Sequence, residues 1–339
     1  MNQVITLAHG EGGEQTHQLI QSLFARHFGN HAESVFDGTV LPLTQAGTTG
    51  ELVITTDSFV VHPLFFPGGN IGKLAIAGTV NDLVVSGAVP AYLTAAFILE
   101  EGFSLEQLER IVSSMAEEAN KAGVRIVAGD TKVVEKGKAD GVFINTTGIG
   151  FRPAKAAQLS PAYCQEGDVI IVTGTVGDHG TAILMERENF GIEHKAESDC
   201  ASLNHMLLEV LEKHEGIRLM RDATRGGLAT VLVEWAEDFG LTIELEEEKV
   251  PVSETVQGIS RILGYDPLYL PNEGKAVLLV DRQEAESVLQ VLRSHEEGSQ
   301  AAVIGTVNKT SGSQLLLCTP LGMHRRLNRL TGIQLPRIC

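Results

Sequence analysis

The sequence ends in a cysteine, Cys339, and a thiol at the end of a chain can travel in a way that a thiol inside a fold cannot. Pro336 excludes a helix at that point and favours an extended backbone before it, so we expect the C-terminal end to be a flexible, extended segment. Residues 332–339 span at most roughly 27 Å when fully extended, which is enough to cross an active-site cleft. The pattern predicts a mobile nucleophile that is carried to its site.

The α-carboxylate of Cys339 lies about 5 Å from the sulfur and disfavours the thiolate by roughly 0.8 kcal/mol in water. Arg337, two positions earlier, can partly neutralise that carboxylate. A frayed terminus is the alternative, since disorder concentrates at chain ends. A prenylation signal is excluded, because it places its cysteine four residues from the end.

Aspartates supply a second candidate chemistry. Three of them follow predicted strands and one lies in an apolar helix of small residues; in chain order they are Asp57, Asp82, Asp130 and Asp222, with Asp82 in the helix. Oxygen ligands without a histidine or cysteine cluster favour Mg²⁺ over zinc or copper. Several carboxylates that share Mg²⁺ beside glycine-rich turns indicate a nucleoside triphosphate site. Capping and turn roles for all four aspartates remain the alternative.

Three glycine-rich segments could offer backbone N–H groups to phosphates: residues 8–14, 66–73 and 222–227. A plain turn is the alternative for the first of them. The second is not a P-loop, because Pro67 stands where the first glycine belongs and Leu74 replaces the Ser or Thr that would meet Mg²⁺.

The composition is typical of a soluble α/β enzyme, with 43% hydrophobic residues, 36 glycines and 5% aromatic residues in 339. A net charge of −17 argues against binding to nucleic acid or to an anionic membrane surface. No leader pattern and no long apolar run is present, so we expect a cytoplasmic protein. Cys164, Cys200 and Cys318 form no CxxC motif, which indicates neither a zinc site nor a disulfide framework, and we interpret them as incidental or core residues.

Patterning along the chain predicts two α/β domains of ordinary size with mixed sheets, helices and a flexible C-terminal tail. Ser104 to Gln107 is a capping box that opens a helix ending at Gly123. We expect the following division: first domain 1–150, linker 151–167, second domain 168–322, mobile tail 323–339.

The run from Asp57 to Pro90, the Gly-Asp-Thr at 129–131 and the Asp-x-Thr-x-Gly-Gly at 222–227 resemble the ATP-binding superfamily of aminoimidazole ribonucleotide synthetase, selenophosphate synthetase and thiamine-monophosphate kinase. The Pro-Arg-Ile-Cys end and residues 65–73 resemble one family within it, the HypE hydrogenase maturation proteins. The resemblance covers essentially the whole chain. It implies a two-domain fold like that of aminoimidazole ribonucleotide synthetase, with nucleotide in a cleft that a homodimer of first domains helps to form.

The resemblance further implies an ATP-dependent carbamoyl dehydratase with Cys339 as the carrier. HypE proteins receive a carbamoyl group from the carbamoyltransferase HypF and convert the S-carboxamide to an S-thiocyanate. They then pass the cyanide to iron on a HypC–HypD complex for [NiFe] hydrogenase.

We assign roles on this basis as a hypothesis. Lys132 and Glu273 orient and deprotonate the carboxamide, because each adjoins a glycine turn at the end of an element; an ion pair between Glu273 and Lys275 is the alternative. Mg²⁺ is assigned to the four aspartates. ATP contacts are assigned to Gly10, Gly12, Gly13, Gly68, Gly69, Asn70, Lys73, Asn81, Gly129, Thr131 and Thr224.

Two other functions stay open. One is a synthetase or kinase of the same superfamily that acts on a free small molecule, as in selenophosphate synthesis. That enzyme commonly carries a cysteine or selenocysteine in its N-terminal glycine loop, and residues 1–30 contain no cysteine. The other is a non-enzymatic carrier that only presents the Cys339 thiol to a partner.

Overall fold

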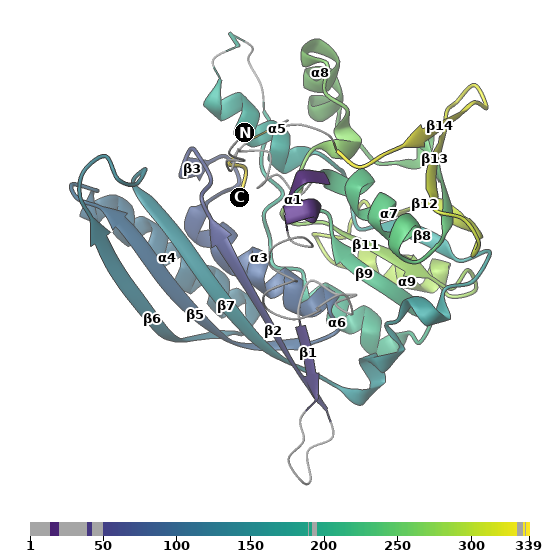
Figure 1. Ribbon diagram of the computed structural model, residues 1–339, viewed down its shortest axis with the longest axis horizontal. Helices are drawn as coiled ribbons and strands as arrows, with labels where there is room; N and C mark the ends of the chain where they lie inside the picture. The colour runs from purple at the N-terminus through teal and green to yellow at the C-terminus, as the bar shows by residue number, and fades with distance from the viewer. Residues whose placement is uncertain are drawn as a thin grey trace.

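The computed structural model describes residues 14–19, 39–42, 50–188, 190–191, 195–330, 335 and 337–339 (Figure 1). The strands are β1 (Thr39–Pro42), β2 (Glu51–Phe59), β3 (Phe65–Phe66), β4 (Gly69–Asn70), β5 (Val89–Glu100), β6 (Arg125–Val134), β7 (Val142–Arg152), β8 (Val169–Val172), β9 (Ile217–Asp222), β10 (Thr242–Glu246), β11 (Ala276–Val280), β12 (Ala302–Lys309), β13 (Gln314–Cys318) and β14 (His324–Leu327).

The α-helices are α1 (Glu14–Leu19), α3 (Ile71–Val85), α4 (Leu105–Ala122), α5 (Asp178–Arg187), α6 (Asn204–Lys213), α7 (Gly227–Asp238), α8 (Glu254–Leu263) and α9 (Ala285–Arg293). Within the described residues, none of the helices is both long and apolar enough to cross a membrane.

The described strands form two large sheets and one small hairpin sheet. The first sheet has five strands in the order β1-β2-β7-β5-β6, and the second has seven in the order β14-β13-β10-β12-β8-β11-β9. In the first sheet only β5 and β6 run parallel, and in the second only β10 and β13 do. Both sheets are therefore mixed, as we expected from the sequence.

Helices α3 and α4 cover one face of the first sheet (Figure 1). Helix α4 begins after Ser104, whose Oγ accepts the Gln107 N–H over 3.4 Å. It ends at Gly123, which has the left-handed conformation that glycine adopts at low cost, with φ 72°. The predicted start and end of this helix are confirmed.

Helix α3 is buried and lies between the two sheets (Figure 1). All of its 15 residues except Lys73 and Asp82 are buried. A helix that is apolar on every side belongs in the interior, where its small residues let neighbouring backbones approach closely. This helix contacts β9 and α6 of the second domain, so it carries Asp82 to the junction of the domains.

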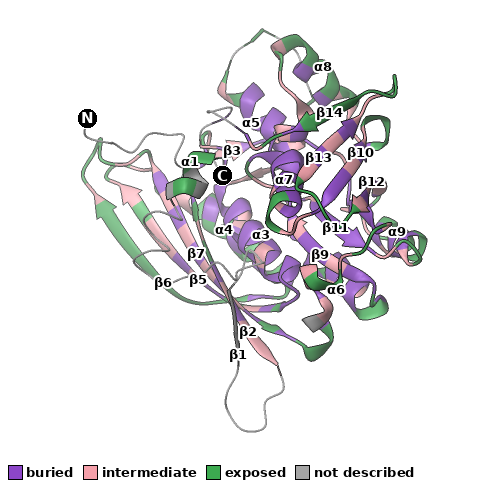
Figure 2. Cartoon of the chain, turned by 45° about the vertical axis from the view of Figure 1, so that its right-hand side comes forward, coloured by how far each residue is buried: buried purple, intermediate pink, exposed green. Residues whose placement is uncertain are grey.

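The second sheet is covered on both faces, by α6 and α9 on one side and by α7 on the other (Figure 2). Its central strands β8 and β11 are buried at every position. Continuous apolar strands of this kind are expected where helices cover both faces of a sheet.

Two strands run further than the sequence indicated, and this moves two aspartates away from strand ends. Strand β2 continues past Asp57 to Phe59, because its ladder with β7 extends that far. Strand β6 continues past Asp130 to Val134, because it stays paired with β5. Asp222 is the last residue of β9, in agreement with its predicted position at a strand end.

Parts of the tail that we predicted from residue 323 are placed by the structure, and its mobility stays a prediction. Residues His324–Leu327 form β14, which pairs antiparallel with β13 and belongs to the second sheet. Leu335 and Ile338 are buried in the core that α3 and the first sheet share. The structure therefore holds the chain end in a docked position.

Gly72→Ala should destabilise the protein by about 1–3 kcal/mol, the usual effect of overpacking. The added Cβ would lie 2.3 Å from the Ile111 carbonyl oxygen on α4. Gly258 in α8 is the matched control, because a Cβ there meets nothing within 4 Å. Gly258→Ala should stabilise by up to about 1 kcal/mol through helix propensity. Urea unfolding compares the two variants, and shifts of the same sign would contradict the close packing of α3 on α4.

Candidate active site

A cavity of about 420 Å³ lies where β2 and α3 of the first domain meet β9 and α7 of the second. Both domains supply its walls, so the site exists only when they are packed together. Six residues predicted from the sequence line it: Asp57, Asp82, Asp222, Thr224, Glu273 and Cys339.

Three of the predicted metal-binding carboxylates reach this cavity from different elements. Side chains alternate along β2, so Asp57 shares with Thr55 and Phe59 the face that packs toward α3. Thr55 Oγ1 donates to Asp82 Oδ2 over 2.6 Å, which orients the carboxylate on α3. Asp222 arrives at the end of β9. The donor set is oxygen only, which fits Mg²⁺.

Glu273 is buried at the wall of the cavity, with 3% of its surface exposed. Burial raises the pKa of its carboxyl well above the ordinary value, and the charges of Asp222, Asp199 and Asp57 add to that rise. Its Oε1 has no hydrogen-bond partner among the described residues. The predicted alternative, an ion pair with Lys275, is not formed, since Lys275 Nζ instead lies 3.7 Å from Asp199 Oδ2.

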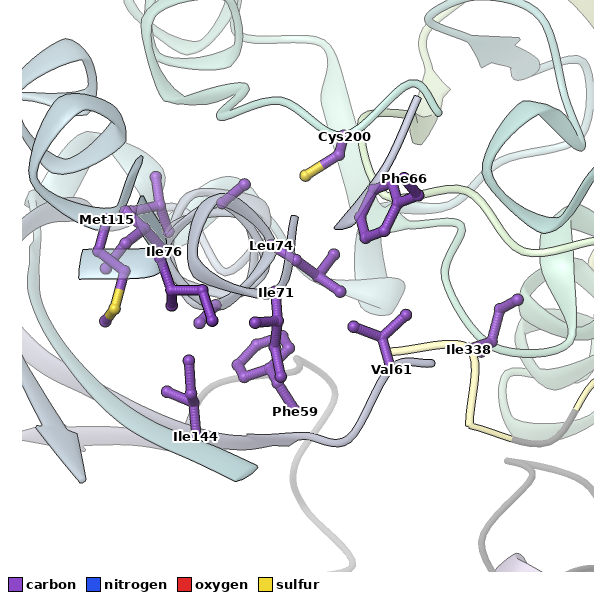
Figure 3. Packing of buried hydrophobic residues seen from close by; sticks show 14 of the residues in the cluster. Phe59, Val61, Phe66, Ile71, Leu74, Ile76, Met115, Ile144, Cys200 and Ile338 are labelled. Atoms are coloured by element: carbon purple, nitrogen blue, oxygen red, sulfur yellow. The ribbon is translucent and has the colours of Figure 1, made fainter. Parts of the chain in front are cut away.

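The chain end pairs with the segment that follows β2. The Val60 N–H donates to an α-carboxylate oxygen of Cys339 over 2.9 Å, and the His62 N–H donates to the Arg337 carbonyl oxygen over 3.3 Å. Ile338 lies between these two residues and is 3% exposed, packed in the same core cluster as Val61 (Figure 3). In this C-terminal strip, residues 337–339, Arg337 has a left-handed backbone with φ 55°, the Ile338 side chain enters the core and Cys339 lines the cavity.

A buried histidine holds this strip from the second domain. His179 Nε2 donates to the Ile338 carbonyl oxygen over 2.8 Å, and its Nδ1 lies 2.7 Å from Ser198 Oγ. Burial lowers the pKa of the imidazole, so the ring is neutral and its Nδ1 accepts from the serine hydroxyl. The histidine is therefore a satisfied structural group of the docked strip.

Two arginines complete the attachment of the strip. Arg187 Nη2 donates to the carbonyl oxygens of His62, over 2.8 Å, and Arg337, over 2.9 Å. The Arg337 guanidinium donates to the Val60 carbonyl oxygen over 3.0 Å and pairs with the Asp140 carboxylate. The hydrogen bond from the Arg337 guanidinium lowers the pKa of the Asp140 carboxyl.

Arg225, which we did not predict from the sequence, also lines the cavity. The negative charge at Cys339 is the largest influence on its pKa and raises it, with smaller contributions in the same direction from Asp57 and Glu273, while burial opposes them. The sequence could have indicated it, because Arg225 lies inside the Asp-x-Thr-x-Gly-Gly motif from which only Asp222 and Thr224 were assigned to the site. A cation therefore faces the chain end across the cavity.

The turn at 66–73 starts helix α3 and is not part of the cavity lining. Asn70 Oδ1 accepts the N–H groups of Gly72 and Lys73 over 2.8 and 3.2 Å. Lys73 Nζ donates to the Gly68 carbonyl oxygen over 3.0 Å. The ATP contacts assigned to this turn, at Gly68, Gly69, Asn70 and Lys73, remain predictions.

Asn81 joins the two domains instead of lining the cavity. Its Nδ2 donates to the Ala201 carbonyl oxygen over 3.0 Å, and its Oδ1 accepts the Leu203 N–H over 2.8 Å. Both partners belong to the segment before α6. The side chain is buried, with 2% of its surface exposed.

Strand β6 holds four further candidates on an exposed surface, namely Gly129, Asp130, Thr131 and Lys132. Lys132 Nζ donates to both Asp130 carboxylate oxygens over 2.7 Å, and this lowers the pKa of the aspartate. Within one chain the structure does not bring them to the cavity. The first glycine loop, with Gly10, Gly12 and Gly13, lies outside the described residues.

Comparison with known proteins gives a family for both halves of the chain. The model of the AIR synthase related protein N-terminal domain matches residues 37–151, and that of the corresponding C-terminal domain matches 165–317. Carbamoyl dehydratase HypE of Escherichia coli (strain K12) is 48% identical over 341 residues, covering 99% of this chain and 99% of the relative.

Solved structures agree with this result. A crystal structure of a HypE–HypF complex matches with TM-score 0.85 and 45% identity, over 92% of this chain and 99% of the other. Hydrogenase maturation protein HypE in complex with ATP matches with TM-score 0.81 and 44% identity, over 99% of this chain and 100% of the other. The chain belongs to the HypE family. The predicted fold class, a two-domain α/β protein of the aminoimidazole ribonucleotide synthetase type, is confirmed together with the family.

Arg187→Gln should loosen the docked strip of this HypE family member and raise the alkylation rate of the Cys339 thiol by at least about tenfold. The charged hydrogen bond to the Arg337 carbonyl oxygen is worth about 1.5–3 kcal/mol, and 1.4 kcal/mol is a factor of ten. Arg261→Gln on α8 is the control and should leave the rate unchanged. Iodoacetamide labelling followed by mass analysis of the C-terminal peptide measures the rate. Equal labelling of both variants would contradict the arginine clamp.

Proposed function

We propose that this protein uses ATP to dehydrate an S-carbamoyl group on Cys339 to an S-thiocyanate, which supplies the cyanide ligand of [NiFe] hydrogenase iron. One observation carries the proposal: the docked chain end lines the same cavity as the carboxylates of Asp57, Asp82, Asp222 and Glu273. The names of relatives support it, since a relative is named a carbamoyl dehydratase and another solved relative holds ATP.

The cavity fits Mg²⁺ and phosphate groups. Asp57, Asp82 and Asp222 would hold the ion, which in such sites keeps waters and phosphate oxygens beside one or two carboxylates. When bound, Mg²⁺ neutralises phosphate charge. Thr224 lines the same cavity, and its hydroxyl can donate to a phosphate oxygen.

The chemical problem is that a carboxamide oxygen is a poor leaving group. ATP supplies the activation, because its γ-phosphoryl group on that oxygen turns it into a phosphate leaving group. The carbon–oxygen bond breaks as the nitrogen gives up its two protons, which end on phosphate and solvent. One S-carboxamide and one ATP thus give one S-thiocyanate, one ADP and one inorganic phosphate.

Glu273 is the group in this chain that we propose takes an N–H proton. Burial and the neighbouring carboxylates raise its pKa, which makes the carboxylate a stronger base. Its unpartnered Oε1 is an acceptor without a donor in the described residues, and an amide N–H is a suitable donor.

The chain end makes the reaction intramolecular. Tethering of the carbamoyl group to Cys339 raises its effective concentration at the site by several orders of magnitude. Arg225 offsets the negative charge at Cys339 and, in our proposal, holds the docked end while the carboxamide reacts.

We propose that HypF-type carbamoyltransferase loads the thiol and that a HypC–HypD complex accepts the cyanide. A solved relative is described as a HypE–HypF complex, which supports the first of these partners. The Cys339 thiol has to stay reduced to accept the group, so a reducing compartment such as the cytoplasm suits the reaction.

A homodimer through β6 is part of the proposal. This strand is the edge of the first sheet and exposes apolar side chains, with Val127 at 51% and Val133 at 66% (Figure 2). Open apolar edges favour pairing with another strand. We propose that a second copy covers this face, and that Asp130 and Lys132 contribute to a nucleotide cleft from there.

Glu273→Gln should lower ATP-dependent phosphate release from the carbamoylated chain by at least about 100-fold, the usual contribution of a general base. The pKa of Glu273 is raised above 4.5, so its contribution to stability is full below that pH and is lost as the pH rises. The glutamine variant should therefore unfold at the same or a higher temperature than the wild type at neutral pH.

Cys339→Ser is the companion control, which should bind nucleotide as the wild type does but release no phosphate on loading. A malachite green assay and a thermal unfolding scan measure these outcomes. A Glu273→Gln variant with the wild-type rate would contradict the proposed base. Loss of nucleotide binding in Cys339→Ser would contradict a separable tail.

A further inference from the structure

Three potential metal ligands meet on the second sheet, away from the cavity. Glu244 lies on β10, Cys318 ends β13 and His324 begins β14. One ligand atom from each lies within 4.8 Å of the other two. We propose that these residues form a surface site for a divalent cation of Zn²⁺ type, a site that is independent of the proposed dehydratase function.

The sheet register brings these residues together. Cys318 pairs directly with His324 in the antiparallel β13–β14 ladder. In the parallel β10–β13 ladder Cys318 is opposite Glu246, so Glu244, two residues earlier, points to the same face. The opposite face is the core, with Ile243, Leu245, Leu315 and Leu317 all buried there.

The turn between Cys318 and His324 is closed by its own hydrogen bonds. The Thr319 N–H donates to the Met323 carbonyl oxygen and the Gly322 N–H donates to the Thr319 carbonyl oxygen, each over 2.8 Å. Thr319 Oγ1 also accepts the Met323 N–H over 3.2 Å. The two ligands across this hairpin are therefore held at a fixed separation.

A polar network orients the carboxylate. Asn308 Nδ2 donates to Glu244 Oε2 over 2.8 Å, and Thr306 Oγ1 donates to Asn308 Oδ1 over 3.0 Å. His324 Nδ1 is 3.6 Å from Glu244 Oε2, close to the spacing of about 3.3 Å between two tetrahedral ligands at zinc bond lengths of about 2.0–2.1 Å. Metal sites typically have such outer partners, which fix the ligand geometry.

The types of ligand atom indicate which class of metal ion the site would bind. One thiolate, one imidazole and one carboxylate suit Zn²⁺ and its neighbours in the first transition row, whereas Mg²⁺ and Ca²⁺ prefer oxygen alone. Cys318 and Glu244 are half-buried and His324 is exposed, so an ion can enter from solvent. Three protein ligands leave a fourth position for water.

The test uses the full-length protein and Co²⁺ as the spectroscopic probe for a Zn²⁺ site. All measurements are made in a Cys339→Ser background, which removes the thiol of the chain end. That protein should develop tetrahedral ligand-field bands and a thiolate charge-transfer band, and the charge-transfer band should correspond to one Co²⁺ per chain. Zn²⁺ competition against a chromophoric chelator gives the affinity.

Cys318→Ser should abolish the charge-transfer band, and His324→Gln should weaken Zn²⁺ binding by at least about 100-fold. Asn308→Ala should weaken it about 10-fold to 100-fold, as outer partners typically do. Cys164→Ser is the matched thiol control, and circular dichroism verifies the fold of each variant. An unchanged charge-transfer band in folded Cys318→Ser, or no thiolate charge-transfer band in the Cys339→Ser background, would overturn the site.

Discussion

The site depends on the two backbone hydrogen bonds that join the chain end to Val60 and His62. They set the position of a short C-terminal strip, residues 337–339, in which Arg337 has a left-handed backbone with φ 55°. In the observed position Ile338 enters the core and Cys339 lines the cavity. The neutral imidazole of His179, from the second domain, fixes the same strip, so domain packing and thiol placement are one constraint.

Local chemistry was readable from the sequence where local residues decide it. Helix α4 begins after Ser104 and ends at Gly123, as predicted. A capping side chain and a left-handed glycine each fix the helix end within one turn of the chain. The lengths of β2 and β6 could not be predicted from the sequence. Pairing with β7 extends β2 past Asp57, and pairing with β5 extends β6 past Asp130. Strand pairing is a long-range property that turn residues along the chain do not report.

Some residues of the cavity could be predicted from the sequence and others could not. The motif at 222–227 led to Asp222 and Thr224 but not to Arg225, because its relation to the chain end appears only when the tail is docked. The proposed role of Glu273 depends on the ion pair of Lys275 with Asp199, because that contact between distant segments leaves Glu273 without the lysine. The division of the chain at 150, 167 and 322, and the roles of the residues on β6, stay predictions.

The most direct test is the mass of the C-terminal peptide after incubation with the carbamoyltransferase partner and carbamoyl phosphate, before and after addition of Mg²⁺-ATP. The account predicts a carbamoyl adduct on Cys339 that loses the mass of one water only when hydrolysable ATP is present. An adduct that never loses water would contradict a dehydratase and leave a thiol carrier. No adduct with an active partner would indicate a free small-molecule substrate.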